Sequence, residues 1–241
     1  MKIRVFDSEQ RVGEAAAARF IEQLRNKPDS VLGMATGSSP LIMYGLLIDA
    51  CRAGTISFAD AVTFNLDEYC GLDAADPHSY RSYMRKNLFD RIDIDPANTH
   101  IPNGNAADIT AECAAYDAAI ESAGGIDLQV LGIGGNGHIG FNEPSDAFSY
   151  GTFVVDLAES TIEANKRFFT RAEDVPRRAV TMGVGSIMNA RSIVLIATGA
   201  KKAQAVRDMI RGGVTPACPA SILQNHPDAL ILLDGPAASL L

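Results

Sequence analysis

Two acidic residues in this sequence are candidates for acid–base chemistry. Asp67 and Glu68 come just after the apolar run 61–65 and Leu66, so we expect them at the end of a β-strand. A carboxyl that is partly buried at such a place has a raised pKa and can serve as a general base. The alternative is that both are solvated loop acids, which is the usual environment of Asp and Glu.

The segment 132–144, with the sequence GIGGNGHIGFNEP, is rich in glycine and carries Asn136, His138 and Glu143. A carboxylate five residues after a histidine can hold that histidine as an acid–base pair. The glycines also match the G-x-G-x-x-G pattern of dinucleotide sites, with Asp156 about twenty residues further on. The helix that must follow that pattern is missing, so we interpret the glycines as a path for close ligand approach. We expect no metal, because no third ligand is evident nearby.

Groups that suit a phosphate occur in two parts of the chain. The first part is a turn between a predicted strand and a predicted helix, formed by Thr36, Gly37, Ser38 and Ser39. Its amides and hydroxyls can bind one phosphate at the positive end of the helix, unless a serine there only caps the helix. The second part supplies the cations Arg167 and Lys202, which can bind the same anion or remain solvated surface charges.

Short apolar runs alternate along the chain with longer stretches of helical periodicity. We expect strands at 3–6, 31–35, 61–65, 128–133, 152–155, 179–182, 192–197 and 229–233, and helices at 8–26, 39–53, 79–89, 107–122 and 200–211. This alternation predicts a single α/β domain over residues 1–241, with a Rossmann-like, mostly parallel sheet of about seven strands and helices on both faces. The candidate residues then lie in loops at strand ends, where such sheets bind ligands.

Composition excludes several classes of protein. The chain has 241 residues, of which 47% are hydrophobic and 21% charged, as is typical of a globular protein. The net charge of −8 offers no basic surface for nucleic acid. The apolar runs are far shorter than the ~20 residues that span a bilayer, and no signal-peptide segment follows the first charges. We therefore expect a cytoplasmic protein that binds neither nucleic acid nor a membrane.

Five motifs resemble those of the glucosamine-6-phosphate deaminase family. In chain order they are TGSSP at 36–40, FNLDEY at 64–69, GGNGHIGFNEP at 134–144, KRFF at 166–169 and TGAKKA at 198–203. The resemblance covers nearly the whole chain and implies conversion of a hexosamine phosphate, glucosamine 6-phosphate, to fructose 6-phosphate and ammonia without an organic cofactor. Phosphogluconolactonases share the fold, but in them a different sequence follows the histidine, where this chain has IGFNE.

The resemblance also implies catalytic roles. Asp67 would take the C2 proton of the open-chain sugar and return it at C1. His138, oriented by Glu143 and Asn136, would move the proton that opens the pyranose ring. Some members of the family carry Asp where this chain has Asn136, and an amide cannot stabilise an imidazolium as a carboxylate does. Glu143 would then fill that role alone.

The remaining implications concern binding and regulation. The turn 36–39, Arg167 and Lys202 would bind the 6-phosphate, and a lid around 157–178 would close over the sugar. Allosteric members carry two basic residues where this chain has Phe153 and Val155. The resemblance therefore implies a non-allosteric enzyme that is a monomer or a small homo-oligomer. The alternatives are a 6-phosphogluconolactonase-type hydrolase and a non-catalytic sugar-phosphate sensor.

Overall fold

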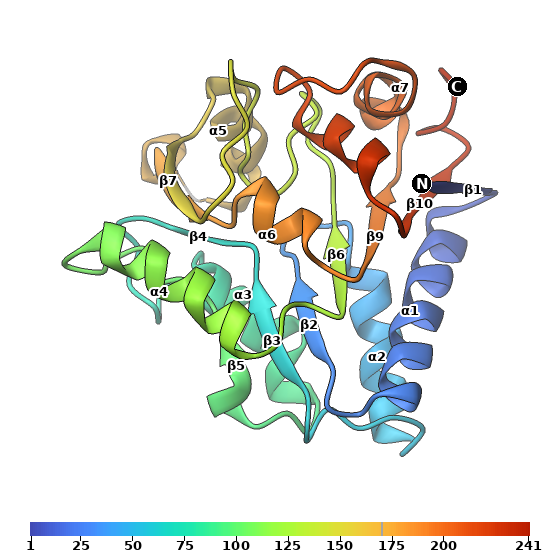
Figure 1. Cartoon of the computed structure of the whole chain (residues 1–241), viewed down its shortest axis with the longest axis vertical. Helices are drawn as coiled ribbons and strands as arrows, with labels where there is room; N and C mark the ends of the chain where they lie inside the picture. Colours follow the sequence, from blue (N-terminus) through green and yellow to red (C-terminus); the bar gives the residue numbers. More distant parts are fainter. Residues whose placement is uncertain (170) are drawn as a thin grey trace.

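The computed structural model describes residues 1–169 and 171–241 (Figure 1). Within these ranges the larger of two sheets has seven strands, all parallel. In spatial order they are β1 (Lys2–Phe6), β10 (Ala229–Asp234), β9 (Ser192–Ala197), β6 (Leu128–Leu131), β2 (Val31–Met34), β3 (Val62–Asn65) and β5 (Thr99–His100). The central strands β9, β6 and β2 are almost entirely buried, which explains their apolar sequences. The predicted Rossmann-like sheet is confirmed.

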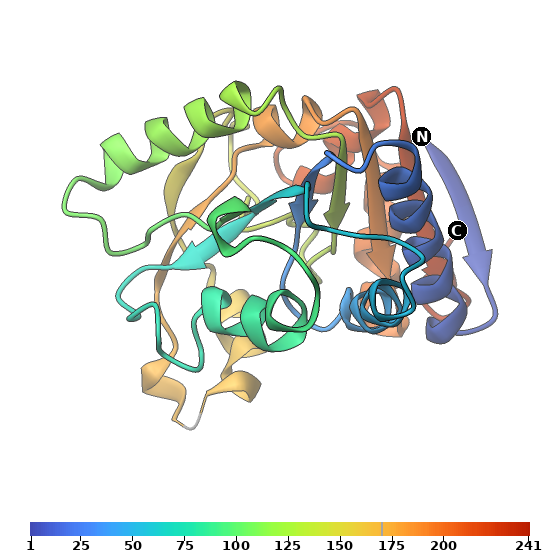
Figure 2. The same ribbon diagram turned by 90° about the horizontal axis from the view of Figure 1, so that it is seen from below.

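Helices cover both faces of this sheet (Figure 2). On one face lie α1 (Glu9–Asn26), α2 (Leu41–Arg52) and α3 (Tyr80–Asn87), and on the other lie α4 (Ile109–Ser122) and α6 (Val184–Met188). Two further helices are α5 (Glu159–Asn165) and α7 (Ala203–Arg211). Three helices, α1, α3 and α4, have side-chain N-caps, which are Ser8, Ser79 and Asp108. Each of these side chains accepts a hydrogen bond from the backbone N–H three residues further along the chain. None of the described helices has the length and apolarity needed to cross a membrane.

A second, smaller sheet was not predicted from the sequence. Its strands, in the order β4 (Asp67–Tyr69), β8 (Arg178–Thr181) and β7 (Phe153–Asp156), are antiparallel. The runs 152–155 and 179–182 therefore form strands as expected, but not in the parallel sheet. Their apolar residues pack into a separate small core, to which Tyr69, Phe141, Leu157, Ile162, Val175 and Ala179 belong. Burial in this core explains why the runs 152–155 and 179–182 are as apolar as strands of a sheet that helices cover on both faces.

Leu66 joins the two sheets. Its N–H donates to the carbonyl of Met34 at the end of β2 (3.1 Å), and its carbonyl accepts from the N–H of Met182 (2.7 Å). Asp67 thus follows immediately where the chain leaves the carboxyl edge of the parallel sheet. From β2 the chain continues outward to β3 and β5, and from β6 it continues to β9 and β10 on the other side. The topological switch between β2 and β6 is the place where doubly wound sheets bind ligands.

Candidate active site

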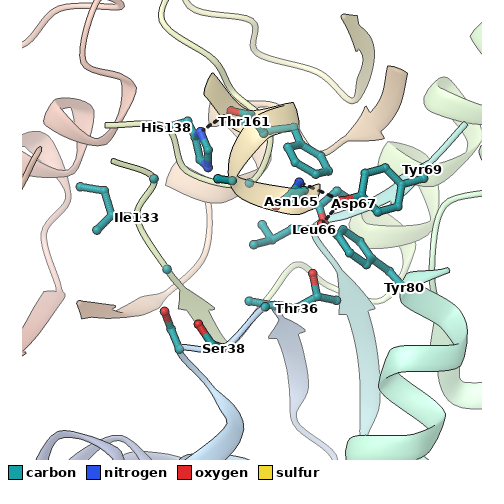
Figure 3. A pocket seen from close by; sticks show the side chains of 18 of the residues that line it. Thr36, Ser38, Leu66, Asp67, Tyr69, Tyr80, Ile133, His138, Thr161 and Asn165 are labelled. Carbon is teal, nitrogen blue, oxygen red and sulfur yellow. Dashed lines mark hydrogen bonds between the residues drawn. The ribbon is translucent and has the colours of Figure 1, made fainter. Parts of the chain in front are cut away.

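A cavity of about 560 Å³ lies at this switch point (Figure 3). Its volume is in the range of sites for small molecules. Nine of the ten residues proposed from the sequence line it, namely Thr36, Gly37, Ser38, Ser39, Asp67, Asn136, His138, Arg167 and Lys202. The tenth, Glu143, does not line the cavity but contacts the ring of His138. Loops that are far apart in the sequence therefore meet as the sheet topology predicts.

One end of the cavity is the turn between β2 and α2. Gly37 has φ of +86°, a left-handed conformation that glycine adopts without strain. The helix begins after Pro40, and no side-chain hydrogen bond caps it. The alternative that a serine serves only as the helix cap is therefore wrong. Ser38 and Ser39 instead line the cavity beside the positive end of α2.

Two cations lie at the cavity wall. The Nζ atom of Lys202 donates to the carbonyl of Ile133 (2.6 Å), which fixes the ammonium against the loop after β6. Burial, and then the neighbouring charge of Arg167, lower the pKa of Lys202. Two like charges that repel each other at one wall are stabilised by an anion between them. The arrangement therefore supports the predicted phosphate site.

Asp67 and Glu68 have different environments in the structure, a distinction that the sequence left undecided. Glu68 caps α3, because its Oε1 accepts the N–H of Tyr80 (2.8 Å) and its Oε2 the N–H of Arg81 (2.9 Å). Asp67 lines the cavity and is 6% exposed. Burial, and then the charge of Glu68, raise the pKa of Asp67 to about 8. Asp67 is thus the candidate base, and Glu68 holds the helix beside it.

His138 is held by the predicted carboxylate partner. Its Nδ1 lies 3.3 Å from Oε2 of Glu143, and Nδ2 of Asn136 donates to the same oxygen (2.7 Å). Burial opposes the ionisation of Glu143, but hydrogen bonds from His138, Thr161 and Asn136 outweigh burial and lower its pKa. An ionised Glu143 can stabilise an imidazolium at His138. A Cβ on Gly134 would lie 2.4 Å from Cε1 of His138, so only glycine leaves room for the ring.

The glycine-rich loop packs directly against Asp67. Gly140 has φ of +56°, and a Cβ built on it would lie 3.5 Å from Oδ2 of Asp67. The candidate base and the His138 loop therefore face one small space.

The dinucleotide pattern in this loop has no structural counterpart. Residues 132–144, all of which the structure describes, contain no helix after β6. Asp156 ends β7 in the smaller sheet, where it is exposed and lies 3.7 Å from Arg178. Among the described residues, no group of three or more His, Cys, Asp or Glu side chains is placed to bind a metal ion.

An aromatic wall was missed in the sequence analysis. The ring of Tyr69 lies 4.7 Å from that of Tyr80, 5.7 Å from that of Phe141 and 5.9 Å from that of Phe169, measured between ring centroids. All four side chains line the cavity. Tyr69 follows Asp67 by two residues in β4, so side-chain alternation along a strand could have placed both on one face. The strand is too short to recognise from its sequence.

Helix α5 forms another wall of the cavity, and the sequence did not predict a helix there. It contributes Ser160, Thr161, Ala164 and Asn165 to the cavity lining. Ala158 precedes it without a side-chain cap, and its sequence is mostly polar, so neither a start signal nor a clear apolar stripe marks it. The helix lies within the predicted lid at 157–178, of which residue 170 lies outside the described residues. Closure of this segment stays a prediction.

Known proteins match the chain over most of its length. The model of the family described as glucosamine-6-phosphate isomerases/6-phosphogluconolactonase matches residues 7–232. The glucosamine-6-phosphate deaminase of Thermoanaerobacter pseudethanolicus is 51% identical over 241 residues, which are 100% of this chain and 95% of that protein. The protein of the same name from Rhodopirellula baltica is 54% identical over 232 residues, 95% of this chain and 92% of that one.

Solved structures match the fold as well. A monomeric glucosamine-6-phosphate deaminase superimposes with a TM-score of 0.97 at 43% identity, over 100% of both chains. The 6-phosphogluconolactonase from Trypanosoma brucei gives a TM-score of 0.78 at 20% identity, over 100% of this chain and 98% of that one. At that identity the second match shows a shared fold alone. With the family model and the relatives above half identity in agreement, the chain belongs to the family of glucosamine-6-phosphate isomerases and 6-phosphogluconolactonases.

Proposed function

We propose that the protein is a glucosamine-6-phosphate deaminase, which converts glucosamine 6-phosphate and water to fructose 6-phosphate and ammonia. One observation carries the proposal: Asp67 and His138 line the same cavity, whose walls also hold the hydroxyls and cations suited to a phosphate. Two relatives at 51% and 54% identity bear this name.

The phosphate would bind at the turn 36–39, with Arg167 and Lys202 as its cations. The amides at the start of α2 and the two positive charges complement a dianion. This contact is remote from the reacting carbons, so its binding energy can orient the sugar for reaction.

The pyranose ring would open at His138. An imidazole can take the proton of the O1 hydroxyl and deliver it to the ring oxygen O5, which breaks the C1–O5 bond and leaves an open-chain aldehyde. While His138 carries that proton it is an imidazolium, and the carboxylate of Glu143 at Nδ1 stabilises this form.

Isomerisation would then proceed through Asp67. Its ionised carboxyl takes the proton from C2 while a proton of the substrate's 2-ammonium group passes to O1, which yields a planar enolamine across C1 and C2. Asp67 returns the proton at C1, and the resulting 2-imine is hydrolysed by water, with C2 becoming a ketone as ammonia leaves. One carboxylate can serve both carbons because they are adjacent. A pKa of about 8 keeps this base near the operating pH, where general-base catalysis is effective.

The competing function is lactone hydrolysis, which needs an activated water but no base over C2. The test incubates the purified protein with glucosamine 6-phosphate and, separately, with 6-phosphogluconolactone. We expect fructose 6-phosphate and ammonium to form in equal amounts from the first compound, with no acceleration of hydrolysis of the second. Lactone hydrolysis without ammonium release would overturn the proposal.

A further inference from the structure

Helix α5 contacts both His138 and Tyr69, which follows Asp67 in strand β4 (Figure 3). Thr161 and Asn165 are four residues apart, so they lie one above the other on the same face of the helix. Thr161 contacts the His138–Glu143 pair, and Asn165 contacts Tyr69 in the strand that carries Asp67. One rigid turn of helix therefore spans the two parts of the site.

The hydroxyl of Thr161 fixes the carboxylate behind His138. Thr161 is 4% exposed and donates to Oε1 of Glu143, while its Oγ1 lies 3.5 Å from Nδ1 of His138. The other oxygen of Glu143, Oε2, accepts from Asn136 and faces His138. With separate donors on its two oxygens, the carboxylate cannot rotate without breaking a hydrogen bond. The imidazole then has one preferred orientation.

The amide of Asn165 fixes the strand of Asp67. Its Nδ2 donates to the hydroxyl of Tyr69 (2.9 Å), whose ring is 2% exposed. Tyr69 belongs to β4 together with Asp67. A displacement of α5 from this strand would break the hydrogen bond and open the wall beside the base.

We propose that Thr161 and Asn165 are positioning residues, which hold the His138–Glu143 pair and the strand of Asp67 in one catalytic arrangement through helix α5. This inference rests on the proposed function and assigns to the helix a role in aligning two successive chemical steps. Ile162 packs into the smaller core, so we expect α5 to stay folded in variants that lack one of these hydrogen bonds while its position against the site shifts.

The first test replaces Thr161 with Val, with Ala as a second variant and Ser as the rescue. We expect kcat for glucosamine 6-phosphate to fall about tenfold in T161V and T161A, the effect of losing one hydrogen bond to a charged group. T161S keeps the hydroxyl and should recover most of the activity. Nitrogen-15 NMR of the imidazole provides a readout that needs no turnover, because the chemical shift of Nδ1 of His138, which faces Glu143 and Thr161, should change in T161V and return in T161S.

The second test concerns Asn165. In N165A we expect KM to rise about fivefold, because the helix occupies its binding-competent position for a smaller fraction of the time. The double variant N165A/Y69F should lose no more than the stronger single variant, since both changes remove the same hydrogen bond. Glu163→Ala is the matched control. Glu163 lies on the same helix but is exposed and pairs with Lys166, so its loss should leave kcat and KM unchanged.

If T161V and N165A keep the kcat, the KM and the imidazole nitrogen-15 shifts of the wild type, this inference is overturned and the deaminase proposal is left intact. Failure of the wild-type protein to release ammonium would instead overturn the proposed function. The nitrogen-15 shifts would still show whether Thr161 orients His138.

Discussion

The reactivity of single side chains here follows from where the chain places them. Asp67 and Glu68 are neighbours with the same functional group, yet one lines the cavity and the other caps a helix. Asp67 is buried beside a second carboxyl, and both conditions oppose its ionisation. A base that is reluctant to ionise in the folded protein must cost stability, because unfolding releases it into water.

That cost predicts a stabilising variant. The pKa of Asp67 is about 8 in the folded protein and near 4 in an unfolded chain. Between these values the folded protein keeps a proton that the unfolded chain has lost, so the free energy of unfolding falls as pH rises from about 4 to about 8. Asp67→Asn removes this dependence. We expect D67N to gain about 3–4 kcal/mol in the free energy of unfolding relative to wild type, or roughly 6–16 °C in Tm, between pH 5 and pH 8.

Thermal unfolding of both proteins across this pH range checks the prediction. Asp60→Asn is the control, because Asp60 is exposed and its replacement should give no such trend. A Tm difference between D67N and wild type that stays constant from pH 5 to pH 8 would show that Asp67 ionises normally.

Among the elements, the three-residue strand β4 determines the site most strongly. It leaves the parallel sheet at Leu66, places Asp67 at the cavity and directs Glu68 at the start of α3. Because the charge of Glu68 helps to raise the pKa of Asp67, the same strand sets the pH at which the candidate base ionises. Removing the charge of Glu68 separates its effect on the pKa of Asp67 from the effect of burial.

We therefore expect Glu68→Gln to shift the pH dependence of kcat/KM. In the wild-type protein kcat/KM should fall as pH drops below about 8, because Asp67 must be ionised to accept the C2 proton. Removing the negative charge of Glu68 lowers the pKa of Asp67, so the acidic limb of E68Q should lie at lower pH. The groups of the substrate titrate equally in both assays. Coincident limbs would mean that Glu68 does not act on Asp67.

The sequence predicts those helices and strands that have a strong local pattern. Ser8, Ser79 and Asp108 cap helices where hydroxyl or acidic residues precede periodic runs. The buried strands of the parallel sheet are apolar throughout, and their order along the chain predicts which loops meet. These two signals are enough to predict that Thr36, Asp67 and His138 lie close together at one edge of the sheet.

Elements defined by tertiary contacts could not be predicted. The strand Asp67–Tyr69 pairs with Arg178–Thr181, which lies more than a hundred residues away, and it has no sequence pattern of its own. Helix α5 carries Thr161 and Asn165 toward the cavity, so its polar residues face inward and hide its periodicity. The role of Glu68 likewise depends on α3 beginning beside it.

In the whole molecule, the turn after β2 of the parallel sheet and strand β4 of the smaller sheet both contribute residues to the cavity lining. Phe153 and Val155, which stand where allosteric relatives are expected to carry basic residues, lie on β7 in that smaller sheet. We expect hyperbolic kinetics that N-acetylglucosamine 6-phosphate does not activate, and a monomer or small homo-oligomer in solution. Rate curves and light scattering check both. A sigmoidal curve that becomes hyperbolic with this compound would contradict the first expectation.

The central claim is that Asp67 moves the C2 proton of a sugar bound by its phosphate in this cavity. The most direct measurement compares the rates at which wild-type protein and D67N form fructose 6-phosphate and ammonium from glucosamine 6-phosphate at saturation. The account predicts that D67N retains a KM close to that of the wild type while kcat falls about 10² or more, as expected for loss of a general base. A D67N protein with undiminished kcat would contradict it.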